Sequence, residues 1–224
     1  MRRGVYVEAE WDPRDPAGEM DFIDALRNEK SFPSVAVAQA WLDREDCAAV
    51  LESHAERDFV RGVRHKPKPG MMDDAQWRAG YARLRPLGLH FELQAPWPQL
   101  EEAARLARDF SDTTMVLNHA GLPLDAELDG WRGAMARLAE CPNVAVKISG
   151  LGRVTRKRDV VLATIDLFGP ERTMFASNFP VDSLCASFDA IYAGFDQITK
   201  GFFEEERRAL FHDNAVRLYR MERP

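Results

Sequence analysis

Short apolar runs alternate with longer segments of helical periodicity along the whole chain. Short β-prone runs predict buried strands, and apolar residues spaced three and four apart predict helices with one buried face. Leu100, Ala103, Ala104 and Ala107 form the clearest such stripe. Strands are expected at 4–10, 34–41, 59–65, 89–94, 113–118, 143–149 and 172–178. Helices are expected at 15–28, 44–57, 73–87, 98–110, 131–139, 159–168, 185–198 and 204–219.

Strands that alternate with helices predict right-handed βαβ units and a parallel sheet. An open doubly wound sheet normally carries a glycine-rich phosphate turn, and no such motif or P-loop occurs here. A (β/α)₈ barrel is therefore the expected fold, although the pattern contains seven strands and a complete barrel typically needs about 250 residues. One strand is expected to be missing, and the absence of a linker predicts a single domain over residues 1–224.

The composition is that of a soluble globular protein, with 46% hydrophobic and 29% charged residues. A net charge of -6 disfavours nucleic acid as a partner, because phosphate binding needs a basic face. No apolar run is long enough to span a membrane or to act as a signal peptide, so a cytoplasmic protein without a membrane partner is expected. The three cysteines show no metal-type spacing.

Polar side chains stand at or near the carboxyl end of every expected strand, where α/β barrels place their chemistry. Because side chains alternate along a strand, Glu92 and Gln94 share one face of theirs, and Lys147 and Ser149 share one face of another. Both polar sets should point into the barrel, since the opposite faces are apolar. A buried ammonium needs a partner, so Lys147 predicts either an internal ion pair with a carboxylate or a contact with an acidic substrate.

His119 follows the fifth expected strand and precedes Ala-Gly-Leu-Pro, a backbone that a ligand can approach. Arg64 and His65 end the third strand, and His65 is open to a second interpretation as part of a solvated exit. Arg64 and Lys147 favour a small anionic substrate, while His119 is suited to polarise a carbonyl or to move a proton. No H-x-H or H-E-x-x-H motif occurs, so the residues themselves assemble no metal site.

The last expected strand ends in Ser177, Asn178 and Pro180, with Asp182 close behind. This segment either delivers groups to an active site or forms only a turn with favourable local hydrogen bonds. The phrases at these strand ends resemble the amidohydrolase-related (amidohydrolase 2) family over nearly the whole chain. They are Val5–Pro13, Val60–Lys66, Leu117–Pro123, Val144–Leu151, Arg172–Asp182 and the closing Phe211–Tyr219.

The resemblance implies a distorted (β/α)₈ barrel in a branch whose lactonases open sugar lactones or carboxylated pyrone and muconolactone rings, some without a metal. By position, His119 matches the histidine after the family's lactone-binding strand, and Arg64 and His65 match its Gly-Val-Arg-His strand end. Asn178 stands where the family usually has a catalytic aspartate. The family's first strand, with its H-x-H pair, is absent, so the chain is expected to be truncated at its amino end.

Two hypotheses follow from the resemblance. In the first, the chain is a lactonase-like hydrolase: His119 acts on the carbonyl or on water, Arg64 and Lys147 hold the substrate's acid group, and Asp182 or Glu92 is the base. A divalent metal such as zinc, with His119 as one ligand, is left open. In the second, the chain is a degenerate barrel that binds a small acid without turnover. Unpaired strand edges beside the gap also predict a homodimer.

Overall fold

The sheet contains the seven expected strands in parallel, in the order in which they occur along the chain. The structure, a computed structural model, describes residues 3–221, so both ends of the expected domain lie outside the described residues. The strands are β1 (Val5–Val7), β2 (Val35–Gln39), β3 (Val60–His65), β4 (His90–Leu93), β5 (Met115–Leu117), β6 (Val144–Ile148) and β7 (Thr173–Phe175).

Helices follow the strands as the periodicity predicts, but two of them differ from the predicted ranges. The helix expected at 73–87 ends at Ala82, and the one expected at 204–219 is interrupted by a π-helical turn, Ala209–Asp213. The α-helices are α1 (Gly18–Lys30), α2 (Cys47–Ala55), α3 (Ala75–Ala82), α4 (Leu100–Asp109), α5 (Leu128–Ala139), α6 (Lys157–Phe168), α7 (Phe188–Ile198), α8 (Glu204–Arg208) and α9 (Asn214–Leu218).

Local sequence explains where several helices lie and end. The α4 stripe of Leu100, Ala103, Ala104 and Ala107 is completely buried, as its spacing predicts. The Asp74 carboxylate accepts a hydrogen bond from the Trp77 N–H at 2.9 Å, which satisfies a free donor in the first turn of α3. Burial of its apolar face holds α4 against the sheet, and the Asp74 cap fixes the start of α3.

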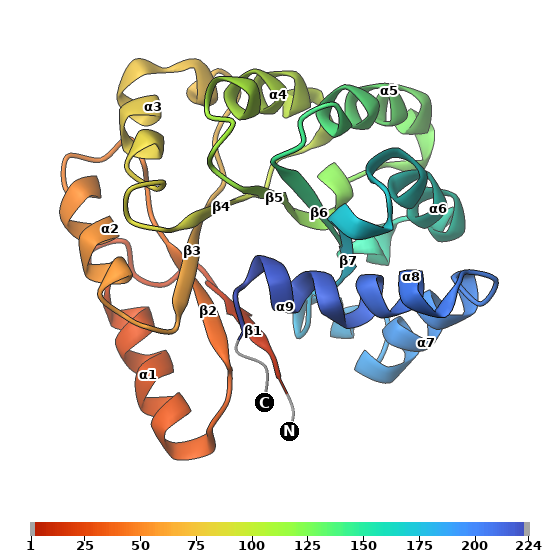
Figure 1. Cartoon of the computed structure of the whole chain (residues 1–224), viewed down its shortest axis with the longest axis horizontal. Coiled ribbons are helices and arrows are strands. Elements are labelled where there is room, and N and C mark those ends of the chain that lie inside the picture. Colours follow the sequence, from red (N-terminus) through yellow and green to blue (C-terminus); the bar gives the residue numbers. More distant parts are fainter. Residues whose placement is uncertain (1–2, 222–224) are drawn as a thin grey trace.

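The register of the strands decides which side chains point into the barrel. Arg64 is aligned with Glu92, Glu92 with Val116, and Lys147 with Met174, so all five residues share one face of the sheet. Helices α1 to α6 surround the opposite face (Figure 1). The predicted inward direction of Glu92 and Lys147 is therefore confirmed.

Strands β1 and β7 are the two edges of the sheet described in residues 3–221, and they do not pair with each other. Helix α9 runs between them (Figure 1), and its last turn reaches into the barrel. Tyr219, which is 2% exposed, packs there with a set of inward-facing apolar residues. That set is Val35, Val37, Val116, Met174 and Met221. The expected fold, a (β/α)₈-like barrel that lacks one strand, is confirmed.

Within residues 3–221, no helix has the length and apolar character needed to cross a membrane.

Candidate active site

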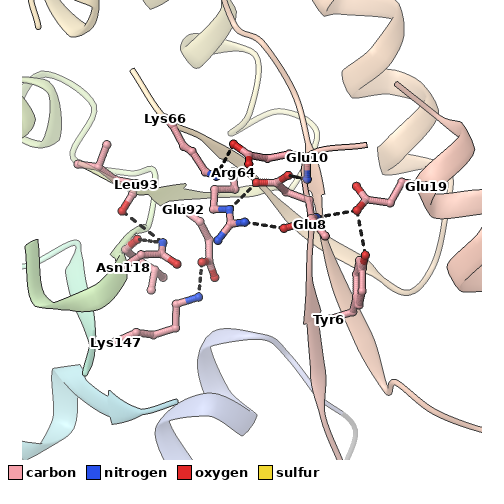
Figure 2. A network of polar contacts seen from close by, with 12 residues as sticks. Tyr6, Glu8, Glu10, Glu19, Arg64, Lys66, Glu92, Leu93, Asn118 and Lys147 are labelled. Carbon is pink, nitrogen blue, oxygen red and sulfur yellow. Dashed lines mark hydrogen bonds and ion pairs between the residues drawn. The ribbon is translucent and has the colours of Figure 1, made fainter. Parts of the chain in front are cut away.

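Glu92 and Lys147 form a buried ion pair across the barrel interior (Figure 2). The Glu92 side chain is fully buried, and its second oxygen accepts a hydrogen bond from the Tyr219 hydroxyl at 2.5 Å. Burial alone would raise the pKa of Glu92, but Lys147 and His90 together outweigh it and hold that pKa well below its usual range. Both carboxylate oxygens are thus engaged, which leaves Glu92 poorly placed to take a proton from water. The internal ion pair predicted as one alternative is present.

A second ion pair lies nearer the carboxyl ends of β1 and β3. Arg64 Nε donates to Glu8 Oε1 at 2.5 Å, and a guanidinium N–H of Arg64 also donates to the Glu8 carbonyl. Lys66 Nζ donates to Glu10 Oε1 at 2.6 Å, and this bond lowers the pKa of Glu10. Glu8 is buried and Glu10 is exposed, so the pairs run from the interior to the surface.

An open cavity of about 340 Å³ lies over these two pairs. Asp43 and Lys68 add further charges to its lining, and Trp41 contributes an aromatic wall. A cavity that carries both signs of charge suits a small polar or carboxylated ligand, because each ligand group finds a complementary partner.

His119 lies at the carboxyl end of β5 in a strained backbone conformation. Its φ is 56°, and Ala120 and Leu122 are also left-handed, with φ of 48° and 54°. Residues other than glycine rarely adopt this region, and such strain concentrates at functional sites. His119 Nδ1 lies 2.9 Å from Ser149 Oγ. The carboxyl ends of β5 and β6 therefore bring His119 and Ser149 together.

The His119 imidazole is neutral at physiological pH. Burial, followed by the positive charges of Lys147 and Arg64, lowers the pKa of His119 to about 3. Gly150 allows the close approach of this ring: a Cβ there would lie 2.8 Å from His119 Nδ1, and Gly150 has a φ of 65°. Ser149 and Gly150 together hold the ring from the β6 side.

Asn178 and Asp182 form a second polar group after β7. Asn178 has a φ of 50°, and its Nδ2 donates to Asp182 Oδ1 at 2.9 Å. Both side chains are half-buried, and Asp182 lines the same cavity as Ser149. The segment therefore combines a left-handed residue with a partly accessible carboxylate, beyond what a simple turn requires.

His65 borders the polar cavity over β1 to β3, but its Nδ1 is engaged by the packing behind the sheet, and Gln94 lies outside that lining. His65 Nδ1 accepts hydrogen bonds from Leu42 N at 3.3 Å and from Trp77 Nε1 at 3.1 Å, between the sheet and α3. Burial lowers the pKa of His65 to about 4, so this ring is a neutral acceptor within the packing. Gln94 is half-buried at the end of β4. Their substrate-binding role stays a prediction, and we place neither in the proposed site.

The donor atoms in this region do not suit a metal ion. In residues 3–221, no three His, Cys, Asp or Glu side chains are grouped closely enough to hold one. His119 is the imidazole of the site, whereas Glu92 and Glu8 are already paired with Lys147 and Arg64. Asn178 offers an amide, which is a weaker ligand than a carboxylate.

Comparison with known proteins shows to which family the chain belongs. The model of the Amidohydrolase family matches residues 1–221. The chain belongs to the amidohydrolase family. It is 39% identical over 239 residues to the uncharacterised protein y4mH of Sinorhizobium fredii, covering 98% of this chain and 80% of that one. An L-fucono-1,5-lactonase of Burkholderia multivorans is 30% identical over 190 residues, covering 74% of this chain and 64% of the lactonase.

The fold of a solved relative agrees with this assignment. The zinc-bound crystal structure of an amidohydrolase from Burkholderia multivorans superposes with a TM-score of 0.86 at 27% identity. The match covers 97% of this chain and 83% of that one. Members of the amidohydrolase family are typically metal-dependent, and this relative contains zinc; the residues of this chain assemble no comparable donor set in the part that the structure describes.

Sequence reasoning missed three contacts of the site. Tyr219 contacts Glu92 from a helix 127 residues away, and nothing in its local sequence indicates that contact. The Glu8 partner of Arg64 was recognisable as a strand-end carboxylate, but its pairing depends on the alignment of β1 with β3 through β2. Lys66, next to His65, reaches Glu10 in the same way.

Proposed function

We propose that this chain hydrolyses the lactone ring of a small carboxylated substrate. The observation that carries the proposal is the neutral imidazole of His119. Ser149 contacts this ring, the backbone of His119 is left-handed, and the positive charges of Lys147 and Arg64 lower the pKa of His119. The family relationship supports hydrolysis, and the similarity to an L-fucono-1,5-lactonase supports a lactone as the substrate class.

His119 acts on the carbonyl group rather than on water. With a pKa of about 3, its imidazole is a weak base at neutral pH, so it accepts a proton poorly. A neutral imidazole donates well, however: if Ser149 Oγ–H donates to Nδ1, the proton of the ring is on Nε2. That N–H then donates to the lactone carbonyl oxygen and stabilises the negative charge that develops there.

Asp182 serves as the base that activates water. Its Oδ1 accepts from Asn178, and Oδ2 is free to accept a proton from a water molecule in the cavity that Asp182 shares with Ser149. Water adds to the carbonyl carbon, the ring C–O bond breaks, and the proton taken by Asp182 returns to the departing alkoxide. Asn178 thereby orients the base instead of acting as one.

The positive groups at the β3 and β6 ends attract the substrate's carboxylate. Arg64 is 11% exposed at its side chain and Lys66 is 33% exposed, so Lys66 is the cation that a ligand reaches first. Lys147 is paired with Glu92, and its positive charge lowers the pKa of His119. Substrate selection thus depends on the polar cavity over β1 to β3.

A binding protein without turnover is the second candidate. Asn178 at the family's aspartate position favours it, because the usual carboxylate base is absent from that position. In the hydrolase, Asp182, four residues after Asn178, takes the place of that base.

The two candidates are separated by a lactone panel. Purified protein is assayed by continuous acid release with L-fucono-1,5-lactone, L-rhamnono-γ-lactone and 2-pyrone-4,6-dicarboxylate, each with and without added zinc. Hydrolysis of at least one lactone, lost in Asp182→Asn but retained in Asp189→Asn on exposed α7, supports the proposal. Binding of these compounds by calorimetry, with no acid release in either condition, supports the second candidate and contradicts the first.

A further inference from the structure

A second cavity, of about 310 Å³, lies on the β7 side of the candidate active site. Ser149 and Asp182, which we place in the catalytic group, form part of its lining. The remainder is largely apolar and includes Ala190, Ile191 and Phe195 of α7. The cavity therefore adjoins the reacting atoms at one end and offers apolar walls at the other.

Helix α7 has an apolar sequence but little burial. Phe195 is its buried residue, at 6% exposure, whereas Ile191 and Ile198 are half-buried and Phe188 is 47% exposed. Apolar side chains at helical spacing normally pack against a core, so a helix that leaves several of them in contact with solvent presents a surface for a ligand or a partner.

The loop between β7 and α7 continues this apolar surface. Phe179 is 44% exposed, Val181 62% and Leu184 89%. Phe179 and Phe188 contact each other edge to face, with ring centroids 5.7 Å apart. Large apolar side chains at this level of exposure, in the loop that also carries the cavity residues Asp182 and Cys185, are typical of a recognition site.

The position of the cavity favours a small ligand over a protein partner. Its volume lies at the lower end of the range of small-molecule sites, about 300–1,000 Å³, and its polar lining includes the catalytic Ser149 and Asp182. The cavity over β1 to β3 is lined mainly by charged and polar residues. The two cavities thus offer complementary environments, one mainly charged and one mainly apolar.

We propose that the cavity beside α7 binds an alkyl or aryl substituent of the lactone, so that the substrate is amphipathic. Its carboxylate end lies over β1 to β3, and its apolar substituent lies against Ile191 and Phe195. This inference rests on the proposed lactone hydrolysis for its catalytic readout, and the binding readout below is independent of turnover.

A chain-length series provides the catalytic test. For γ-butyrolactone, γ-hexalactone and γ-octalactone, kcat/KM is expected to rise by about fourfold for each methylene group that the cavity buries. Gly194 lines the cavity, and a Cβ added there meets no atom within 4 Å, so Gly194→Leu should fold and occupy the space of the ligand. In this variant the increase along the series should disappear.

Gln197→Leu is the matched control. It introduces the same side chain on the same helix, at an exposed position that does not line the cavity. This control should keep the dependence on chain length. If the wild-type protein hydrolyses lactones without any such dependence, or if both variants behave alike, the apolar subsite is contradicted while lactone hydrolysis stands.

Methyl NMR gives the readout that needs no turnover. The δ1 methyl signals of Ile191 and Ile198 should shift on addition of γ-octalactone, shift less with γ-butyrolactone, and shift little in Gly194→Leu. This pattern in a protein that hydrolyses none of the lactones would support the subsite and reject the hydrolase. Methyl signals that do not shift with any lactone would overturn the proposal. If the protein also forms a concentration-dependent dimer that Gly194→Leu abolishes, the surface is an interface between copies of the chain.

Discussion

Two layers of the same barrel interior differ in how their polar groups are satisfied. In the inner layer, Glu92 accepts hydrogen bonds from Lys147 and Tyr219, and all three side chains are almost completely excluded from water. In the outer layer, His119 and Asn178 have left-handed backbone conformations, and their hydrogen-bond partners Ser149 and Asp182 line a cavity. A buried hydrogen-bonded network stabilises a fold, whereas backbone strain beside a cavity is typical of chemistry.

This difference assigns separate roles to residues that look alike in the sequence. Lys147 and Ser149 are two residues apart on the same face of one strand segment, but Lys147 belongs to the inner layer and Ser149 to the outer one. Substitutions in the inner layer should therefore reduce stability first. Substitutions in the outer layer should reduce activity with a smaller effect on stability.

The largest effect is expected from Lys147→Met. Removing one partner of a buried ion pair leaves an unpaired carboxylate, at a cost of about 3–5 kcal/mol in the free energy of unfolding. Urea denaturation measures this loss, and the double variant Glu92→Leu/Lys147→Met should recover part of it because no unpaired charge remains.

Arg105→Met is the control for that measurement. Arg105 pairs with Asp73 at 2.7 Å, but the two side chains are 43% and 45% exposed. Its loss should cost less than about 1 kcal/mol. A similar cost for Lys147→Met and Arg105→Met would show that the inner layer is not a closed network.

A smaller effect concerns His54, a buried residue of the helix layer that lies outside both interior layers. Its Nε2 lies 3.0 Å from the Gln39 carbonyl oxygen, and burial lowers its pKa from 6.5 to about 4. Between these values the unfolded chain binds a proton that the folded chain does not, so stability is full above pH 6.5 and decreases as the pH falls toward 4. From pH 7.5 to 5 the contribution is about 2 kcal/mol.

The free energy of unfolding, measured at pH 7.5 and at pH 5, tests whether burial lowers the pKa of His54. His54→Gln should show about 2 kcal/mol less pH dependence than the wild type. Equal pH dependence in the wild type and His54→Gln would mean that His54 titrates alike in the folded and unfolded chains.

The smallest effect on stability is expected from the backbone strain at His119, in the outer layer. Since His119 has a φ of 56°, His119→Gly should be about 1 kcal/mol more stable than His119→Ala, because alanine retains the left-handed strain. The opposite order is expected at Ala136, within α5, where Ala136→Gly should be destabilising. Thermal unfolding that ranks His119→Ala at or above His119→Gly would contradict strain at this position.

The sequence predicted the inner layer better than the outer one, for a physical reason. The alternation along β4 and β6 determines that Glu92 and Lys147 face inward, and two buried opposite charges then have to meet. Arg64 and His65 were both predicted to bind the substrate, and no local pattern indicated that Trp77 and Leu42 donate hydrogen bonds to the His65 ring. That contact depends on how α3 packs, which no local pattern specifies.

The contribution of the last helix was also beyond sequence reasoning. The periodicity predicted a helix through Tyr219, but the π-helical turn at Ala209–Asp213 changes which residues face the barrel. Tyr219 reaches Glu92 because α9 lies between β7 and β1. A residue's role in closing a barrel depends on the arrangement of the whole sheet, whereas strand and helix positions depend on neighbours in the chain.

The most direct test of the account measures lactone hydrolysis by the wild type and His119→Ala in parallel, with unfolding curves recorded for both. The account predicts that His119→Ala lowers kcat/KM on the best lactone of the panel by about 10²–10³-fold, the range for loss of an oxyanion donor, while the variant remains folded. A folded His119→Ala protein that hydrolyses the lactone at the wild-type rate would contradict the central claim that His119 acts on the carbonyl group.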